Sequence, residues 1–497
     1  MNKISKSGFR VALSITCSLY SLLSFCTSYT VSNSAQITSI MISAQPGDTL
    51  RMTPGVWNNQ VINFGGADGT ASAPIVLIAD VMGQVFLEGS SRLKIYGNYL
   101  VVNGLTFRNP DALALATSHI IEFRSSSSGP FANHCRITNI HIINYNSQNS
   151  VDNKWVSLYG TYNKVDHCKF DGKSNYGPTV VVWYQAAGGF PNESLSTYHT
   201  IEYNYFSNRT LPLGGNGGET IRVGDSQTSR TNGYNVIQYN LFEHCDGEIE
   251  IISNKSEYNY YRYNTFRESN GQLTLRHGAF CTVEGNFFLG KNYQGSSGIR
   301  LIDSAHVIFN NYFEELTGGE VGTLRAPITI MNGDINPAAN GYWPVKNCQI
   351  YNNSFINCLP PYVNIGVDSD VRPESCTFNN NLFYGPAGPF FEVTTNPVNF
   401  QYYNNIYYGA SLGISNTGFV NVDPLLSNTG PYGLYRLTSS SPAIDGGTTV
   451  VISDDFEGQN RISLPDIGSD EYSTTAEVRL PLNPEDVGPC WLTNDPL

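Results

Sequence analysis

The segment Asn240-Leu-Phe242, followed by Asn264-Thr-Phe266 and Asn286-Phe-Phe288, repeats one pattern: asparagine, any residue, aromatic residue. Along the whole chain, successive asparagines of this pattern lie 36, 24, 22, 25, 42, 28 and 24 residues apart. A repeat of this length with short β-rich runs is typical of a parallel β-solenoid, whose stacked coils bury an apolar interior. The other copies are Asn204-Tyr-Phe206, Asn311-Tyr-Phe313, Asn353-Ser-Phe355, Asn381-Leu-Phe383 and Asn405-Ile-Tyr407.

The repeated asparagines are predicted to form a ladder at a corner of the solenoid. Asparagine tolerates left-handed backbone angles and can hydrogen-bond its counterpart one coil away. The aromatic residue two positions later points to the same side of an extended strand and is expected to stack likewise. Both positions are therefore interpreted as scaffold. The two long intervals indicate inserted loops, near residues 210–231 and 320–346, which could open or close a groove.

Composition narrows the classes of protein to consider. The chain has 497 residues, a net charge of −13, 40% hydrophobic and only 14% charged residues, so it can bury a large core and is not disordered. An acidic chain without a Lys/Arg block lacks the surface that nucleic acid requires. No cysteine pair has zinc spacing, so we expect no structural zinc, while both disulfides and buried thiols remain open for the cysteines.

The N-terminus is predicted to be an export signal, residues 1–26. Lys3, Lys6 and Arg10 precede an apolar run, residues 11–25, that is too short to span a bilayer comfortably. Cys26 ends the run and is a candidate for lipidation, although the bulky Phe25 favours ordinary cleavage. We therefore expect an exported protein, periplasmic, cell-surface or secreted, without a membrane span. The predicted domains are one β-helix over residues 35–475 and a C-terminal tail over 476–497.

Strand alternation predicts one column of polar side chains on the exterior. If Ile221 and Val223 face inward, Arg222 faces outward, and the same reasoning turns other polar residues outward. The steps from Arg222 to the next three members are 28, 26 and 24 residues, each about one coil. The predicted column is Arg222, Glu250, Arg276 and Arg300, with Glu248 beside Glu250.

Two outward carboxylates two residues apart could bind a cation. Glu248 and Glu250, with Asn216 from the glycine-rich loop 214–218 of the previous coil, offer the oxygen ligands that calcium prefers. The alternative is a surface ionic network in which the two glutamates pair with Arg222 and Arg276. The carboxylates alone favour neither interpretation.

The surrounding motifs resemble a known family. They are Asn216-Gly-Gly-Glu-Thr-Ile-Arg-Val-Gly224, Glu248-Ile-Glu250, Asn254-Lys-Ser256 and Leu275-Arg-His-Gly278. From about residue 44 to residue 472 the chain resembles polysaccharide lyase family 6, the family of alginate lyases and chondroitinase B. That family shares the spacing of seven from Glu248 to Lys255 and 21 from Lys255 to Arg276. The resemblance implies an all-β fold, a single-stranded right-handed parallel β-helix.

The resemblance also implies a reaction, β-elimination on a uronate. Calcium held by Asn216, Glu248 and Glu250 would neutralise the uronate carboxylate beside the acidic C5 proton. Lys255 would be the general base, and Arg276 would protonate or stabilise the departing O4.

The substrate implied by the family is alginate, an anionic polysaccharide, with Arg222, His277 and Arg300 as contact residues. Two alternatives stay open: a chondroitinase B-like dermatan sulfate lyase, and a non-catalytic glycan-binding β-helix. A glycoside hydrolase of the polygalacturonase type is disfavoured, because that reaction needs a cluster of carboxylates and the exposed coils carry no tight aspartate cluster.

Overall fold

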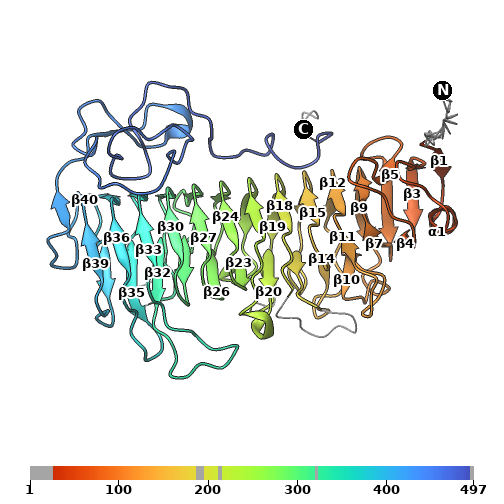
Figure 1. The fold of residues 1–497 in the computed structure, drawn as a ribbon, viewed down its shortest axis with the longest axis horizontal. Helices are drawn as coiled ribbons and strands as arrows, with labels where there is room; N and C mark the ends of the chain where they lie inside the picture. The colour runs from red at the N-terminus through yellow and green to blue at the C-terminus, as the bar shows by residue number, and fades with distance from the viewer. Residues whose placement is uncertain (1–25, 186–194, 211–214, 319–322, 493–497) are drawn as a thin grey trace, which may run out of the picture.

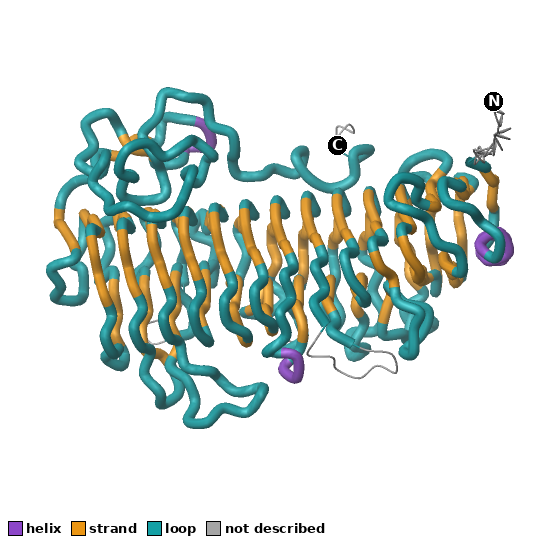
Figure 2. The backbone as a smooth tube through the Cα atoms, in the orientation of Figure 1, coloured by secondary structure: helices purple, strands orange, loops and turns teal. Residues whose placement is uncertain are grey.

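The computed structural model describes residues 26–185, 195–210, 215–318 and 323–492. There the chain winds into a solenoid of short parallel strands stacked in three sheets (Figure 1). Each coil contributes one strand to each sheet, and loops join the strands (Figure 2). The predicted right-handed parallel β-helix is confirmed. The export signal lies outside the described residues except for Cys26, which is exposed. Among the described residues no helix is long and apolar enough to cross a bilayer.

The three sheets, here called A, B and C, run along the solenoid, so neighbouring strands come from successive coils. Sheet A contains β1 (Ser28–Val31), β2 (Thr49–Met52), β5 (Ile75–Ala79), β8 (Leu100–Asn103), β12 (Arg136–Thr138), β15 (Lys164–Asp166), β18 (Thr200–Glu202), β21 (Val236–Gln238), β24 (Tyr260–Arg262), β27 (Thr282–Glu284), β30 (Val307–Phe309), β33 (Gln349–Tyr351), β36 (Thr377–Asn379) and β39 (Gln401–Tyr403). Sheet B contains β3 (Gly55–Asn58), β6 (Val85–Gly89), β9 (Leu105–Pro110), β13 (His141–Ile143), β16 (Lys169–Asp171), β19 (Tyr205–Arg209), β22 (Leu241–Cys245), β25 (Thr265–Arg267), β28 (Phe287–Leu289), β31 (Tyr312–Glu314), β34 (Ser354–Ile356), β37 (Leu382–Tyr384), β40 (Asn405–Tyr408) and β41 (Phe419–Asn421).

Sheet C carries the side chains of the candidate site, described below. Its strands are β4 (Val61–Gly65), β7 (Arg92–Asn98), β10 (His119–Glu122), β11 (Ala132–Asn133), β14 (Lys154–Leu158), β17 (Val180–Val182), β20 (Ile221–Gly224), β23 (Glu250–Lys255), β26 (Gln272–His277), β29 (Ile299–Leu301), β32 (Ile328–Met331), β35 (Val363–Val367) and β38 (Phe391–Val393).

A helix covers the N-terminal end of the solenoid and protects the edges of the sheets there, whereas the C-terminal segment packs on one side. Helix α1 (Ser34–Met41) lies at the N-terminal end, and its Ile37 and Met41 are buried. After β41 an irregular unit with β42 (Leu426–Ser427), β43 (Arg436–Leu437) and the short 3-10 helix η2 (Pro431–Gly433) packs on the outer face of sheet B. From there the chain runs back along the solenoid as far as Trp491, beside His141 (Figure 1). The predicted division at residue 475 stays a prediction.

The asparagine ladder is present at all eight predicted positions. In each step the backbone N–H and the side-chain Nδ2 of one asparagine donate to Oδ1 of the next, at 2.9–3.1 Å. All of these side chains are buried, so the ladder satisfies backbone donors that water cannot reach. The ladder therefore holds each coil in register with the next.

The predicted conformation of the ladder asparagines is wrong. The left-handed residue is the one before each asparagine, for example Tyr239 with φ 51° and Tyr263 with φ 58°. The turn therefore reverses the chain before the asparagine, whose side chain is left free to hydrogen-bond along the axis. The predicted aromatic stack is present inside the solenoid, with ring centroids 4.6–5.1 Å apart, in the order Phe170, Phe206, Phe242, Phe266, Phe288, Phe313, Phe355 and Phe383.

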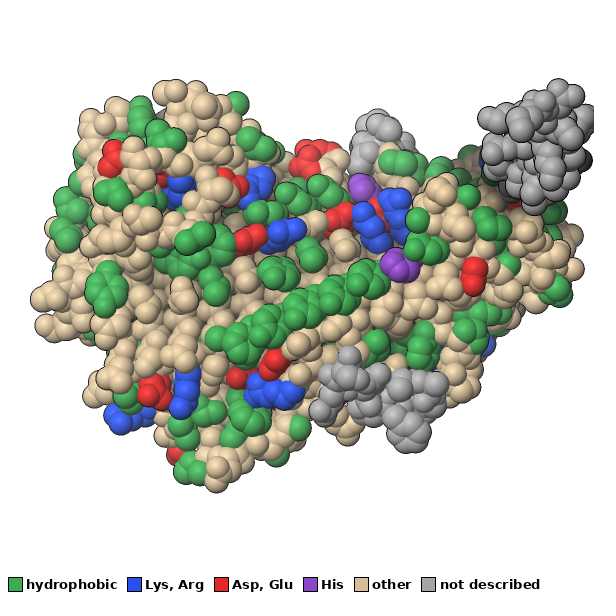
Figure 3. Space-filling model, viewed as in Figure 1, with side chains coloured by type: hydrophobic (Ala, Val, Ile, Leu, Met, Phe, Trp, Pro, Cys, Tyr) green, Lys and Arg blue, Asp and Glu red, His purple; other side chains and the backbone are tan. Residues whose placement is uncertain are grey.

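A second aromatic stack lies on the surface, at the corner between sheets C and A. We call it the corner stack; its ring centroids are 4.7–5.4 Å apart, and every member has φ between 51° and 61°. Figure 3 shows a continuous hydrophobic stripe along this corner. Ring-to-ring packing offsets the cost of these left-handed angles. Its members are Tyr99, His134, Tyr162, Tyr198, Tyr234, Tyr258 and Phe280.

The cysteines inside the solenoid are unpaired. Within the described part of the chain no disulfide forms, and Cys135, Cys168, Cys245, Cys281, Cys348, Cys358 and Cys376 are buried thiols. Burial raises the pKa of Cys245 and of Cys281 to about 12, so these thiols are small core residues.

Replacing Asn264 by alanine tests the ladder. The substitution removes the acceptor for the backbone N–H and Nδ2 of Asn240 and the donor to the carbonyl of Ile237. With these groups unpaired in the interior, we expect a loss of about 2–4 kcal/mol in unfolding free energy, measured by urea denaturation. Asn396→Ala, at an exposed position, is the control. Equal midpoints for the two variants would contradict a stabilising role for the ladder.

Candidate functional site

The candidate site is a cleft of about 730 Å³ along strands β23 and β26, with Glu248 and Glu250 at the amino end of β23 and Lys255 at its carboxyl end. Seven of the eight predicted site residues line it, and the structure thus brings together the proposed base, acid and metal ligands. Arg222 is the predicted residue that does not line the cleft. The seven are Asn216, Glu248, Glu250, Lys255, Arg276, His277 and Arg300.

The predicted exterior column is wrong in its register. Strand β23 carries a bulge between Glu250 and Ile252, and a second irregularity follows where Lys255 pairs with His277. Each irregularity shifts the pairing between β23 and β26 by one residue. Glu250 therefore pairs with Gln272, and Arg276 has no partner in the predicted column. The observed column of paired residues is Arg222, Ser253, Thr274 and Arg300.

Glu248 accepts hydrogen bonds from the glycine-rich loop of the previous coil. The backbone N–H groups of Gly217 and Gly218 donate to its Oε2 at 2.6 and 2.8 Å. Gly217 has φ +97°, a left-handed conformation that glycine adopts without strain. Burial, followed by the charges of Glu219 and Glu250, raises the pKa of Glu248 to about 7. The carboxylates therefore repel one another across the cleft.

Glu219 was missed by the sequence reasoning. It is 2% exposed, and its Oε2 has no hydrogen-bond partner in the described part of the chain. It lies in the Asn216-Gly-Gly-Glu219 motif, so the signal was present in the sequence as a third glutamate near the predicted pair. Its charge adds to the uncompensated negative potential at Glu248.

Glu250 is held by cations. Its Oε1 forms an ion pair with the buried guanidinium of Arg300 and lies 3.8 Å from Nε of Arg276, while Ser253 donates to its Oε2. The ionic-network alternative is therefore present for Glu250, with Arg300 in place of Arg222. Among the described residues, no ion pair involves Glu248.

His277 and Lys255 meet at the end of their strands. His277 is buried, and burial, followed by the charges of Arg276 and Lys255, lowers its pKa to about 3. Its Nε2 lies 3.4 Å from Oγ of Ser226, in the short 3-10 helix η1 (Ser226–Thr228). The imidazole is thus neutral near pH 7 and can exchange hydrogen bonds with a substrate without adding charge.

The loop predicted near residues 320–346 contributes the far wall of the cleft. Tyr342 covers Arg276, with the guanidinium carbon 4.2 Å from the ring centroid. Arg325 also lines the cleft, and burial together with the charge of Arg300 lowers its pKa. Neither residue stood out in the sequence, because the 42-residue interval marks an insertion but not which of its side chains return to the cleft.

Arg222 lies apart, on the outer face of sheet C. Its guanidinium carbon is 4.9 Å from the ring centroid of Trp183. It forms no ion pair within the described ranges, and its Nε is buried without a hydrogen-bond partner there. Lys291, on a later coil and outside the cleft, is exposed and pairs with Glu268 at 3.0 Å.

The oxygen donors of the cleft, Asn216, Glu248 and Glu250, can hold a hard divalent cation only together with ligands other than carboxylates. In the described residues no three His, Cys, Asp or Glu side chains converge on one point. The amide oxygen of Asn216 and the carboxylates of Glu248 and Glu250 nevertheless line the same cleft, and the raised pKa of Glu248 shows an unneutralised cluster. Such oxygen ligands suit calcium, with a substrate carboxylate or water completing the shell.

The comparisons with known proteins agree with this picture. The family model described as Chondroitinase B matches residues 31–421. The solved structure of the alginate lyase AlyGC is 31% identical, with a TM-score of 0.77 and coverage of 91% of this chain and 59% of that one. A mannuronic acid specific family 6 lyase from human gut microbiota is 28% identical, with a TM-score of 0.68, covering 80% of this chain and 91% of that one.

A polysaccharide lyase from Pseudopedobacter saltans is 26% identical, with a TM-score of 0.69 and coverage of 93% and 99% of the two chains. No curated protein matches the sequence. The chain spans 59% of the length of AlyGC. The fold is a parallel β-helix with a charged cleft on its outer surface. The chain belongs to polysaccharide lyase family 6.

The ion pair of Arg300 and Glu250 gives a stability prediction. Arg300→Met leaves Glu250 buried with its partner removed, and we expect a loss of about 3–5 kcal/mol in unfolding free energy, measured in urea with a chelator present. Lys291→Met removes an exposed pair and should cost about 0–1 kcal/mol. Adding Glu250→Gln to Arg300→Met should recover part of the loss, and a further loss in that double variant would contradict the assignment.

Proposed function

We propose that the protein is an alginate lyase that cleaves polyuronate chains by β-elimination, with calcium as cofactor. The observation that carries the proposal is that an amine, a guanidinium and three oxygen ligands line one cleft on the outside of the solenoid. Family membership supports the class of reaction, since the similar solved structures are described as polysaccharide lyases. In the described part of the chain Glu248 has no ion-pair partner, which leaves it available to a cation. Lys255, Arg276 and Arg300 in the same cleft suit an anionic substrate.

The proposed division of labour follows the geometry. Asn216, Glu248 and Glu250 would hold calcium, which supplies charge neutralisation for the uronate carboxylate. Lys255 removes the C5 proton, the C5–H electron pair forms the C4–C5 double bond, and the C4–O4 bond breaks. Arg276 protonates or stabilises the departing O4, and Glu250 and Tyr342 orient its guanidinium. His277 and Arg300, which line the cleft, and Arg222 outside it are the proposed substrate contacts.

Alginate is proposed over the dermatan sulfate of a chondroitinase B-like enzyme. The similar structures at 31% and 28% identity are described as an alginate lyase and a mannuronic acid specific lyase. The family model that matches carries the name Chondroitinase B, which keeps dermatan sulfate as the second candidate. A non-catalytic glycan-binding β-helix would have no need for both Lys255 and Arg276 in one cleft. Export to the periplasm, cell surface or medium is also proposed, from the N-terminal sequence.

Substrate assays test the proposal directly. The protein is incubated with polymannuronate, polyguluronate and dermatan sulfate, and the unsaturated product is followed by its ultraviolet absorbance. We expect Lys255→Ala and Arg276→Ala each to lower turnover of alginate by roughly 10²–10⁴-fold, because each removes a proton-transfer or stabilising group. Lys291→Ala, an exposed cation outside the cleft, should leave turnover unchanged. Elimination at the original rate by Lys255→Ala would refute the assignment of the base.

Calcium binding can be measured without substrate. Calcium should raise the thermal unfolding temperature of the chelator-treated protein, because a ligand that binds only the folded state stabilises it. Glu248→Gln should abolish that rise, since it removes a charged ligand, whereas Glu268→Gln, beside Lys291 and outside the cleft, should retain it. A calcium-induced rise that persists in Glu248→Gln would contradict the proposed ligands. In the lyase assay, a chelator should abolish product formation and added calcium restore it.

A further inference from the structure

A second cleft lies on the same outer face of sheet C, towards the N-terminus. Strand register links it to the candidate site: Gly224 pairs with Lys255, and the residue after Val182, Trp183, lies in the same outward row one strand earlier. Gly224 has φ +84° and presents no side chain. The surface between Trp183 and Lys255 is therefore not obstructed by a side chain in this row.

The row continues away from Lys255 as a stack of aromatic rings. Phe131, Tyr159 and Trp183, which we call the aromatic row, stack with centroids 6.2 and 6.1 Å apart and interplanar angles of 17° and 9°. Tyr159, in the middle, is 2% exposed, so the row presents its two outer rings, Phe131 and Trp183, to a polymer. Arginines accompany them: the guanidinium carbon of Arg124 lies 3.8 Å from the centroid of Tyr159, and that of Arg222 lies 4.9 Å from Trp183. Aromatic rings interleaved with cations suit a polymer that is both sugar and anion.

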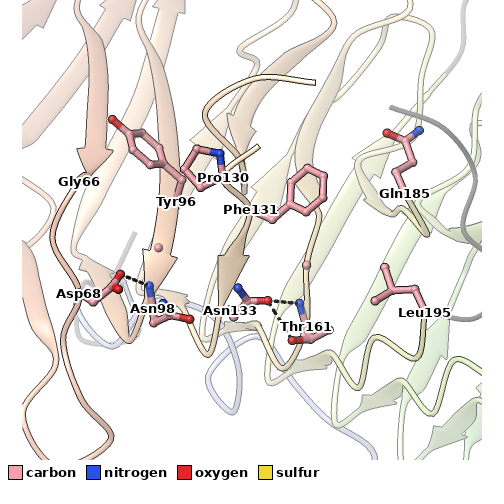
Figure 4. A pocket seen from close by; sticks show the side chains of 12 residues that line it. Gly66, Asp68, Tyr96, Asn98, Pro130, Phe131, Asn133, Thr161, Gln185 and Leu195 are labelled. Carbon is pink, nitrogen blue, oxygen red and sulfur yellow. Dashed lines mark hydrogen bonds between the residues drawn. The ribbon is translucent and has the colours of Figure 1, made fainter. Parts of the chain in front are cut away.

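Beyond Phe131 the row ends at a pocket of about 500 Å³, which we call the distal pocket. Figure 4 shows Tyr96 and Phe131 on its two sides, with Asp68, Asn98 and Asn133 below them. Oδ1 of Asp68 accepts from the backbone N–H of Asn98, and Oδ1 of Asn133 accepts from Thr161. The second oxygen of Asp68 and the amide nitrogen of Asn133 form no hydrogen bond within the described residues, so they can meet sugar hydroxyls.

Unpaired donors lie between the two clefts. Nε1 of Trp183 and Nε of Arg222 are buried and have no hydrogen-bond partner in the described ranges. Buried donors are normally paired, and a site that leaves two of them side by side favours a ligand with acceptor oxygens. Arg222 as a whole is only partly buried, so a uronate carboxylate lying along the row would meet its charge, and a small shift of the side chains would expose both donors to it.

We propose that the distal pocket and the aromatic row bind the same polyuronate chain that the candidate site cleaves, several sugars away from the bond that breaks. This inference rests on the proposed function. From β7, which carries Tyr96, to β23, which carries Lys255, there are five strand-to-strand steps, or roughly 24 Å at ~4.8 Å per step. A 1,4-linked pyranose advances its chain by a similar distance, so each sugar occupies about one rung. Long chains therefore bind more tightly than short ones.

The corner stack supplies a matched control. Its rings also stack rung by rung, at the corner between sheets C and A, and their faces cover one another. Tyr162, 48% exposed, lines neither cleft. A substitution there removes an exposed aromatic side chain without touching the proposed polymer path.

The test measures binding of size-defined uronate oligosaccharides by calorimetry, with calcium present, to Lys255→Ala, which leaves the ligands intact. We expect affinity to rise with length until a chain spans both clefts. Adding Tyr96→Ala and Phe131→Ala should lower affinity for the long chains by roughly tenfold, with little change for dimers and trimers. Phe131→Leu, a milder change that keeps apolar bulk, should give a smaller loss in the same direction, and Tyr162→Ala should keep the rise with length.

Two results would contradict polymer binding at the distal pocket. One is an affinity that does not depend on chain length, and the other is a loss of affinity in the distal variants that is equal for short and long chains. These outcomes are separate from failure of the proposed function. If the unaltered protein forms no unsaturated product from any uronate polymer, the lyase proposal fails whatever the length dependence. If it forms product and affinity does not depend on chain length, only the proposal of polymer binding at the distal pocket fails.

Discussion

The whole structure depends on each coil being held in register with the next by the buried asparagine ladder. Each of the six ladder asparagines between Asn204 and Asn405 uses its Oδ1 for two donors of the preceding coil and its own N–H and Nδ2 for the following one. Because a parallel sheet places partners at equal depth along the axis, a fixed register at this corner sets the height of every side chain on the other two sheets. The candidate site inherits its geometry from that constraint.

The candidate site lies where the regular pairing of strands β23 and β26 is interrupted. The bulge in β23 and the irregular pairing of Lys255 with His277 bring Glu250, Lys255 and Arg276 to the same cleft although they occupy different rows. Bulges commonly re-aim side chains next to functional sites, and here they place an amine beside a carboxylate cluster. Arg300 and Arg276 compensate the buried charge of Glu250, whereas Glu248 has no ion-pair partner in the described part of the chain and is available to a bound cation.

The electrostatics of the outer face of sheet C suit an anionic polymer on an otherwise acidic protein. The cations Lys255, Arg276 and Arg300 converge on the cleft, and Arg222 extends the positive surface towards the aromatic row. Local clustering of one sign of charge concentrates a ligand of the other sign even when the net charge of the protein opposes it. Burial first, and then the charges of Arg276 and Lys255, lower the pKa of His277, so its imidazole adds no positive charge to the cleft near pH 7.

Much of the fold and the identity of most site residues could be read from the chain itself, because a repeat of asparagine and aromatic residues reports contacts between neighbouring coils that recur with a fixed period. The motifs from Asn216 to Gly278 likewise identified six residues that meet in one cleft, and the coil spacing added Arg300. Three things required the tertiary structure: the left-handed residue before each asparagine, the true exterior column with Arg222 beside Ser253, and the return of Tyr342 to Arg276. Alternation along a strand predicts a face only while the pairing is regular, and one inserted residue changes the partner of every position after it. A loop side chain reaches its target through packing between distant parts of the chain, which leaves no periodic trace in the sequence.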